Sequence, residues 1–118
     1  MKYLIALLFA VSVSAFAETD SYQIKSSYDV GSGELEGDIT FLIDNGKEAN
    51  FSMDYIESFK VAVQKQTENQ VLVSFNFTAD TTENQYQTDA QVLIDLNKEV
   101  ELKFGNDLFR FFISKKGT

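Results

Sequence analysis

The chain contains no cysteine, no histidine, no proline and no tryptophan. Without cysteine it can form neither disulfides nor thiolate metal sites. Without histidine it lacks the most frequent general base of enzymes, and it can form neither a Ser–His nor a Cys–His nucleophile pair. We therefore predict a protein that is not an enzyme and that holds no metal and no cofactor. The absence of proline also removes one of the usual protections of exposed sheet edges.

Positive charge is scarce as well. The chain has 10 lysine and arginine residues against 18 aspartate and glutamate residues, which gives a net charge of −8. Because phosphate attraction dominates binding to nucleic acids and to anionic membranes, this balance argues against both as partners. We predict that the partner is another protein. The simpler alternative is that the acidity only keeps the protein soluble.

The first seventeen residues have the three parts of a secretory signal. Lys2 supplies the positive start, residues 3–13 are mostly apolar, and Ala15-Phe16-Ala17 is a small-x-small cleavage site. The apolar segment is shorter than the roughly twenty residues of a membrane-spanning helix. We predict a bacterial Sec-type signal peptide cleaved after Ala17, a periplasmic or secreted location, and no stable membrane anchor after cleavage. Residues 18–118 then form a single domain.

Apolar residues alternate with polar ones through most of the mature chain, and no segment has a convincing helical period. Asn45-Gly46 is a strong signal for a two-residue hairpin. We expect strands near residues 22–30, 35–43, 49–53, 59–63, 71–77, 92–94, 100–104 and 109–113. About eight short strands predict an all-β fold, an antiparallel β-sandwich of immunoglobulin-like architecture. A small closed β-barrel is the alternative, and the order of strand pairing stays open.

The chain also contains two segments of similar sequence. Residues 42–48 read LIDNGKE and residues 93–99 read LIDLNKE, and residues 59–65 align with residues 109–115. The pattern predicts two similar units within the one domain.

Four apolar residues break the alternation, because they fall on the face opposite the expected core: Leu42, Leu72, Leu93 and Phe112. An apolar patch on the outer face of a sheet is typical of a partner-binding surface. The alternative is that these side chains cover a sheet end, or return to the core at a bulge.

Residues 79–91 are almost entirely polar, and we expect them to form the longest loop. Long loops often carry function, so the candidates here are Asp80, Glu83, Tyr86 and Asp89. The carboxylates among them lack the dense spacing of a known calcium loop, so we predict no metal site there.

Three functions fit these features. The first is a non-enzymatic protein-binding module, for example an accessory factor in envelope assembly or secretion. The second is an acidic inhibitor of a basic secreted hydrolase such as lysozyme, which rests on charge and size. The third is a small-ligand carrier, which requires a barrel with an open mouth.

Overall fold

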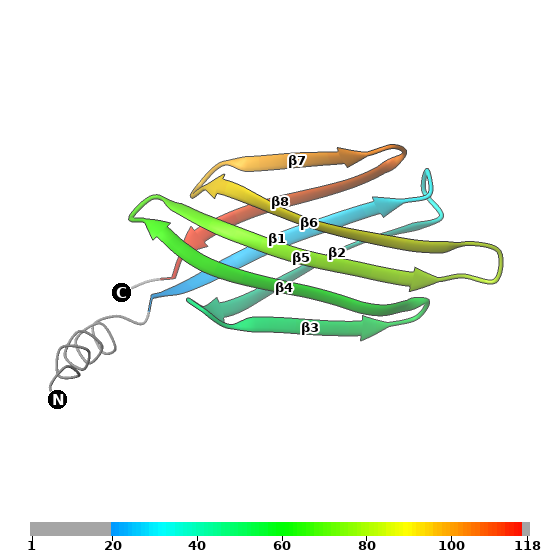
Figure 1. The fold of residues 1–118 in the computed structure, drawn as a ribbon, viewed down its shortest axis with the longest axis horizontal. Coiled ribbons are helices and arrows are strands. Elements are labelled where there is room, and N and C mark those ends of the chain that lie inside the picture. The colour runs from blue at the N-terminus through cyan, green and yellow to red at the C-terminus, as the bar shows by residue number, and fades with distance from the viewer. Residues whose placement is uncertain (1–19, 117–118) are drawn as a thin grey trace, which may run out of the picture.

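In a computed structural model, which describes residues 20–116, the chain forms two antiparallel sheets packed face to face (Figure 1). The described residues contain eight strands and no helix. The strands are β1 (Ser21–Val30), β2 (Leu35–Asp44), β3 (Glu48–Met53), β4 (Ile56–Thr67), β5 (Gln70–Asp80), β6 (Gln85–Asp95), β7 (Glu99–Phe104) and β8 (Asp107–Lys115).

Sheet A has the strand order β2-β1-β8-β7, and sheet B has the order β3-β4-β5-β6. The predicted eight-stranded sandwich is therefore confirmed, and residues 20–116 form no closed barrel. The chain runs up and down between strands that are neighbours in sequence, and it changes sheet after β2 and after β6. Immunoglobulin domains instead use Greek-key connections, so the likeness is limited to two packed antiparallel sheets.

Phenylalanine fills the space between the sheets. Five buried rings from β4, β5 and β8 lie with neighbouring centroids 5.1–6.4 Å apart: Phe59, Phe75, Phe77, Phe109 and Phe111. Complete burial of such a side chain stabilises a fold by about 1.5–3 kcal/mol. This apolar packing supplies the stability that many secreted domains obtain from disulfides.

The predicted loop over residues 79–91 is wrong in extent. β5 continues to Asp80 and β6 begins at Gln85, so only residues 81–84 form the loop. The alternation is hidden in the sequence because two inward positions of β6 are Thr88 and Ala90, which give a weak hydrophobic signal. Both are only half-buried, since β6 is an edge strand, and small or polar side chains are tolerated there.

The two halves of the chain correspond strand by strand, because β1–β4 and β5–β8 are arranged alike in exchanged sheets. Equivalent backbone hydrogen bonds brace the two sheet-changing turns: Gly46 N donates to Val63 O, and Asn97 N donates to Ile113 O, both at 2.8 Å. Gly46 and Asn97 both adopt the left-handed conformation, with φ of 83° and 63°. Glycine and asparagine are the residues that do so most readily. That the halves derive from a repeated sequence unit stays a prediction.

The sandwich has two different ends (Figure 1). The four hairpin turns, β1–β2, β3–β4, β5–β6 and β7–β8, lie together at what we call the hairpin end. The sheet-changing turns and the β4–β5 turn lie at the opposite end, which we call the crossover end, together with the two ends of the described chain. The predicted signal peptide and its cleavage site lie outside the described residues. Within residues 20–116 no helix is long and apolar enough to cross a membrane.

A polar cluster joins the two sheets at the crossover end. Lys65 of β4 lies 2.8 Å from a carboxylate oxygen of Asp20 and 3.0 Å from one of Glu68, and Lys115 of β8 lies 3.2 Å from Glu68. The hydrogen bond from Lys65 is the main reason that the pKa values of both carboxyl groups lie below their usual range. The cluster therefore favours the folded state while these acids are ionised.

Candidate binding surfaces

The four apolar residues singled out in the sequence do not form one patch. Leu42 of β2 and Phe112 of β8 lie on the outer face of sheet A, whereas Leu72 and Leu93 lie opposite each other on the outer face of sheet B. Leu42 is 57% exposed and Leu93 is 51% exposed, while Leu72 and Phe112 are half-buried. Each outer face thus carries two of them, and the faces point in opposite directions.

A shallow groove of about 610 Å³, which we call groove A, crosses the outer face of sheet A. Its outward-facing side chains come from all four strands of the sheet: Lys25, Ser27, Asp38, Thr40, Glu99, Arg110 and Phe112. In the strand register Lys25 lies directly between Thr40 and Phe112. The groove therefore offers an aromatic ring beside charged groups of both signs.

The two cations of groove A differ in their pairing. Arg110 Nε lies 3.0 Å from Glu101 and 3.7 Å from Glu99, so its charge is shared by two carboxylates on β7. Lys25 is exposed and forms no ion pair with any other described residue. An unpaired ammonium next to a half-buried phenylalanine is a suitable contact for an incoming carboxylate or carbonyl oxygen.

A second groove of about 390 Å³, groove B, crosses the outer face of sheet B at the corresponding place. Three charged positions match between the grooves, with Asp89 in place of Asp38, Lys60 in place of Arg110, and Glu48 in place of Glu99. The floor differs, because Ser74 stands where groove A has Lys25 and Ala62 stands where it has Phe112. Groove B is smaller, and it has no aromatic side chain on its outward face.

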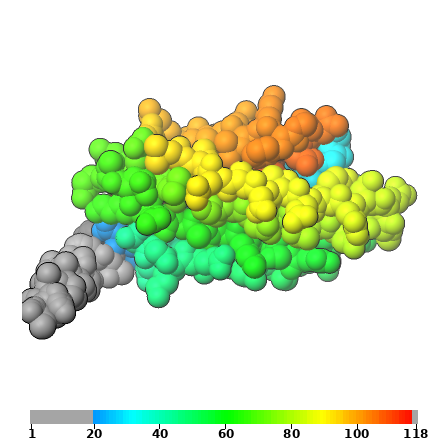
Figure 2. Space-filling model, viewed as in Figure 1, coloured from blue at the N-terminus to red at the C-terminus, as the bar shows by residue number. Residues whose placement is uncertain are grey.

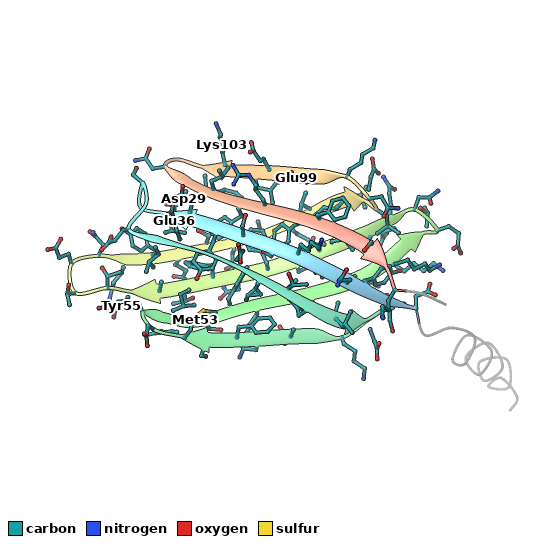
Figure 3. All side chains as sticks on the ribbon, turned by 180° about the vertical axis from the view of Figure 1, so that it is seen from behind. Asp29, Glu36, Met53, Tyr55, Glu99 and Lys103 are labelled. Atoms are coloured by element: carbon teal, nitrogen blue, oxygen red, sulfur yellow. The ribbon has the colours of Figure 1, made fainter. Side chains whose placement is uncertain are left out.

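The hairpin end concentrates negative charge. Its ionisable residues on the strand ends and turns are Asp29, Glu34, Glu36, Asp54, Glu57, Asp80, Glu83, Lys103 and Asp107, of which only Lys103 is basic. The crossover end, in contrast, mixes lysines with acids. Figure 3 shows Asp29 and Glu36 close together on strands β1 and β2, near the hairpin end. The charge is thus polarised along the length of the strands.

Two apolar side chains stand in this acidic region, at the β3–β4 turn. Met53 is 41% exposed and Tyr55 is 56% exposed, and Figure 3 labels both toward the hairpin end of the β3–β4 pair. Tyr55 has a φ of 67°, which is rare for a bulky residue. Its backbone oxygen accepts a hydrogen bond of 2.8 Å from Asp80 N, which helps to hold this conformation.

The residues predicted as a functional loop are divided among three settings. Asp80 and Glu83 lie at the hairpin end, and Asp89 lies in groove B, where it accepts a hydrogen bond of 2.7 Å from Asn76. Tyr86 belongs to β6, and its hydroxyl donates to Glu34 of the β1–β2 turn. This contact lowers the pKa of Glu34 and raises that of Tyr86. Tyr86 therefore joins the two sheets.

No group of three or more histidine, cysteine, aspartate or glutamate residues within 20–116 is arranged to hold a metal ion. Sequence reasoning overlooked Lys25 and Arg110, because single charged residues at outward strand positions look like ordinary surface residues. What distinguishes them is their position on β1 and β8, the two central strands of sheet A, which only the fold shows. No protein-family model, curated protein or solved structure matches the chain.

Proposed function

We propose that the chain is a non-enzymatic protein-binding module of the periplasm or the cell exterior, and that groove A is its binding site. The observation that carries the proposal is Phe112, a large apolar side chain on the outer face of a sheet that faces water. Such a face is expected to be polar, and aromatic residues are enriched among those that dominate binding energy. A role in envelope assembly or secretion fits the predicted signal peptide.

The contacts of groove A favour an extended segment of a partner. The groove runs across four strands, so a segment lying in it meets Thr40, Lys25, Phe112 and Glu99 in succession. The exposed Leu42 extends the apolar contact toward the crossover end. An apolar side chain on Phe112 and a carboxylate on Lys25 are the expected anchors of the partner.

The experiment is an affinity capture from periplasmic extract with three forms of residues 18–118 as bait. The double variant Leu42→Ser/Phe112→Ser should lose the captured partner, by at least tenfold in yield. The matched control Leu72→Ser/Leu93→Ser changes the same kinds of residue on the opposite face and should keep it. Urea unfolding of all three forms separates loss of binding from loss of fold. Equal capture by both variants, or strong destabilisation of the first, contradicts the proposal.

A second candidate function, an acidic inhibitor of a basic secreted hydrolase such as lysozyme, is supported by the charge polarisation. The acidic hairpin end offers Tyr55 as an exposed apolar anchor. Electrostatic association weakens with salt, so inhibition should be strongest at low ionic strength. It should fall in the variant Asp54→Asn/Glu57→Gln and persist in Asp44→Asn, which removes a charge from the other end. A lysozyme that is fully active at low salt excludes this candidate for that enzyme.

The third hypothesis, a small-ligand carrier, gains no support from the described residues. The space between the sheets is occupied by the phenylalanine cluster, and both grooves lie outside it.

A further inference from the structure

The sandwich exposes four edge strands, and three of them carry features that oppose pairing with another chain. β3 and β7 are short, and β3 has an irregular register between Phe51 and Met53. β2 is longer, but it carries Glu36, Asp38 and Asp44. Short edges, bulges and charge are the recognised protections of sheet edges. The fourth edge, β6, is neither short nor irregular, and over its whole length it carries two acids, Asp89 and Asp95, against the three of β2.

β6 is eleven residues long, and it pairs with β5 in one continuous register from Gln85 to Asp95. Between its two end residues it carries a single charge, Asp89. Its backbone groups on the side away from β5 have no strand partner within the described residues. It is thus a long, regular and nearly uncharged edge.

The side chains of β6 that face the core are incompletely covered. Tyr86, Ala90 and Val92 are only partly buried, and so is Val100 of the neighbouring edge strand β7. Figure 2 shows β6, in yellow, running along the surface beside the orange strand β7. A further strand added at this edge would hydrogen bond to β6 and shield these apolar groups from water.

We propose that this further strand is β6 of a second copy of the chain. Two copies related by a two-fold axis would join their β6 strands antiparallel, and sheet B would continue across the interface as an eight-stranded sheet. Such isologous contacts are the commonest way in which proteins form dimers. The interface leaves groove A open, so it is independent of the proposed function, but it includes Asp89, Ala90 and Gln91, which line groove B.

The length and charge of β6 determine the register. Pairing over the whole strand from Gln85 to Asp95 places the two-fold axis at Ala90, the central residue. Asp89 then lies opposite Gln91 of the second copy, whose amide can donate to the carboxylate, and no two acids are directly opposed. A similar pairing of two β2 strands about Thr40 would place Glu36 of each copy directly opposite Asp44 of the other. The register therefore favours β6 over the other long edge.

The first test measures the oligomeric state of the unmodified residues 18–118 by sedimentation velocity over a range of protein and salt concentrations. Because each copy is strongly acidic, the dimer should become more populated as salt rises from 10 to about 150 mM, where screening is substantial. A monomer at every concentration up to 1 mM overturns the proposal.

The second test uses the absence of cysteine, which makes any introduced cysteine the only one. At the two-fold axis the two Cα atoms lie about 4.5–5.5 Å apart, within the range of a disulfide. Ala90→Cys should therefore form a covalent dimer under mild oxidation at least tenfold faster than two controls. Gln87→Cys lies on the same strand but roughly 20 Å from its copy, and Thr40→Cys lies on the β2 edge. A dimer that cross-links equally well through the controls uses another interface and overturns the proposal.

Discussion

Grooves A and B occupy corresponding places on the two outer faces, yet they present different surfaces. Three of their charged positions match in sign, and the register of their strands is the same. The larger differences lie at two floor positions, where groove A has Lys25 and Phe112 and groove B has Ser74 and Ala62. The backbone therefore provides two equivalent grooves, but only groove A has an unpaired ammonium group beside an aromatic ring.

The same comparison extends to the interior, where the halves are alike at most positions. Phe59 of β4 and Phe109 of β8 are equivalent, fully buried and in contact, with centroids 6.4 Å apart. The largest difference is at Ser26 of β1, because its equivalent in β5 is Phe75. Its hydroxyl is buried and has no hydrogen-bond partner among residues 20–116. The halves thus share their architecture, but β5 contributes a large aromatic side chain to the core where β1 contributes a small polar one.

The largest expected effect on stability tests whether the two halves of the chain contribute equally to the core. Phe59→Ala and Phe109→Ala should each lower the free energy of unfolding by about 3–5 kcal/mol, because each leaves a cavity in the aromatic cluster. Urea unfolding followed by circular dichroism measures both values. If the two losses in the free energy of unfolding differ by more than about 2 kcal/mol, the equivalent rings do not contribute equally to the packing energy, and the two halves are not energetically equivalent.

A smaller change in stability, of opposite sign, is expected at Ser26, where the two halves differ inside the core. Ser26→Ala removes a buried hydroxyl that lacks a partner, so it should raise the free energy of unfolding by about 1 kcal/mol. The neighbouring Ser27→Ala, on the outer face, is the control and should change stability by less than about 0.5 kcal/mol. Destabilisation by Ser26→Ala in the same urea experiment would show that the hydroxyl is satisfied.

The smallest effect concerns the cluster at the crossover end, where equivalent lysines of the two halves, Lys65 and Lys115, meet. The pKa values of Asp20 and Glu68 are lower in the folded protein than their ordinary values of 3.8 and 4.5. Their contribution to stability is therefore present above about pH 5 and is lost as the pH falls through the folded pKa values. Urea midpoints measured from pH 7 to pH 3 should fall less steeply in Lys65→Met than in the unmodified chain. If the urea midpoint depends on pH in the same way in both proteins, the contacts of Lys65 with Asp20 and Glu68 do not stabilise the fold.

Much of the architecture could be predicted from the sequence, because alternation reports directly on a sheet with one buried face. It worked best for β5, whose inward residues are all buried, and for the strand expected near residues 59–63, which lies within β4. It failed for most of β6, where Thr88 and Ala90 stand at inward positions of an edge strand.

The binding surfaces were harder to predict than the strands. The departures from alternation identified Leu42 and Phe112 but could not assign them to one face and Leu72 and Leu93 to the other. That assignment depends on which strands share a sheet, which is set by contacts distant in sequence. Lys25 and Arg110 gave no signal at all, because the groove that unites them exists only after β1 and β8 pair.

The pairing of β1 with β8 also brings the two ends of the described chain together, with Lys116 N donating to Ser21 O at 2.7 Å. A short linker between them would close the polypeptide into a ring without crossing either groove. New termini could then be opened at the hairpin end, giving a circular permutant with the same strand order. A tag fused directly before residue 20 or after residue 116 would leave the domain at the crossover end, away from Tyr55. The crossover end thus holds both ends of the described chain, and the hairpin end holds the four hairpin turns.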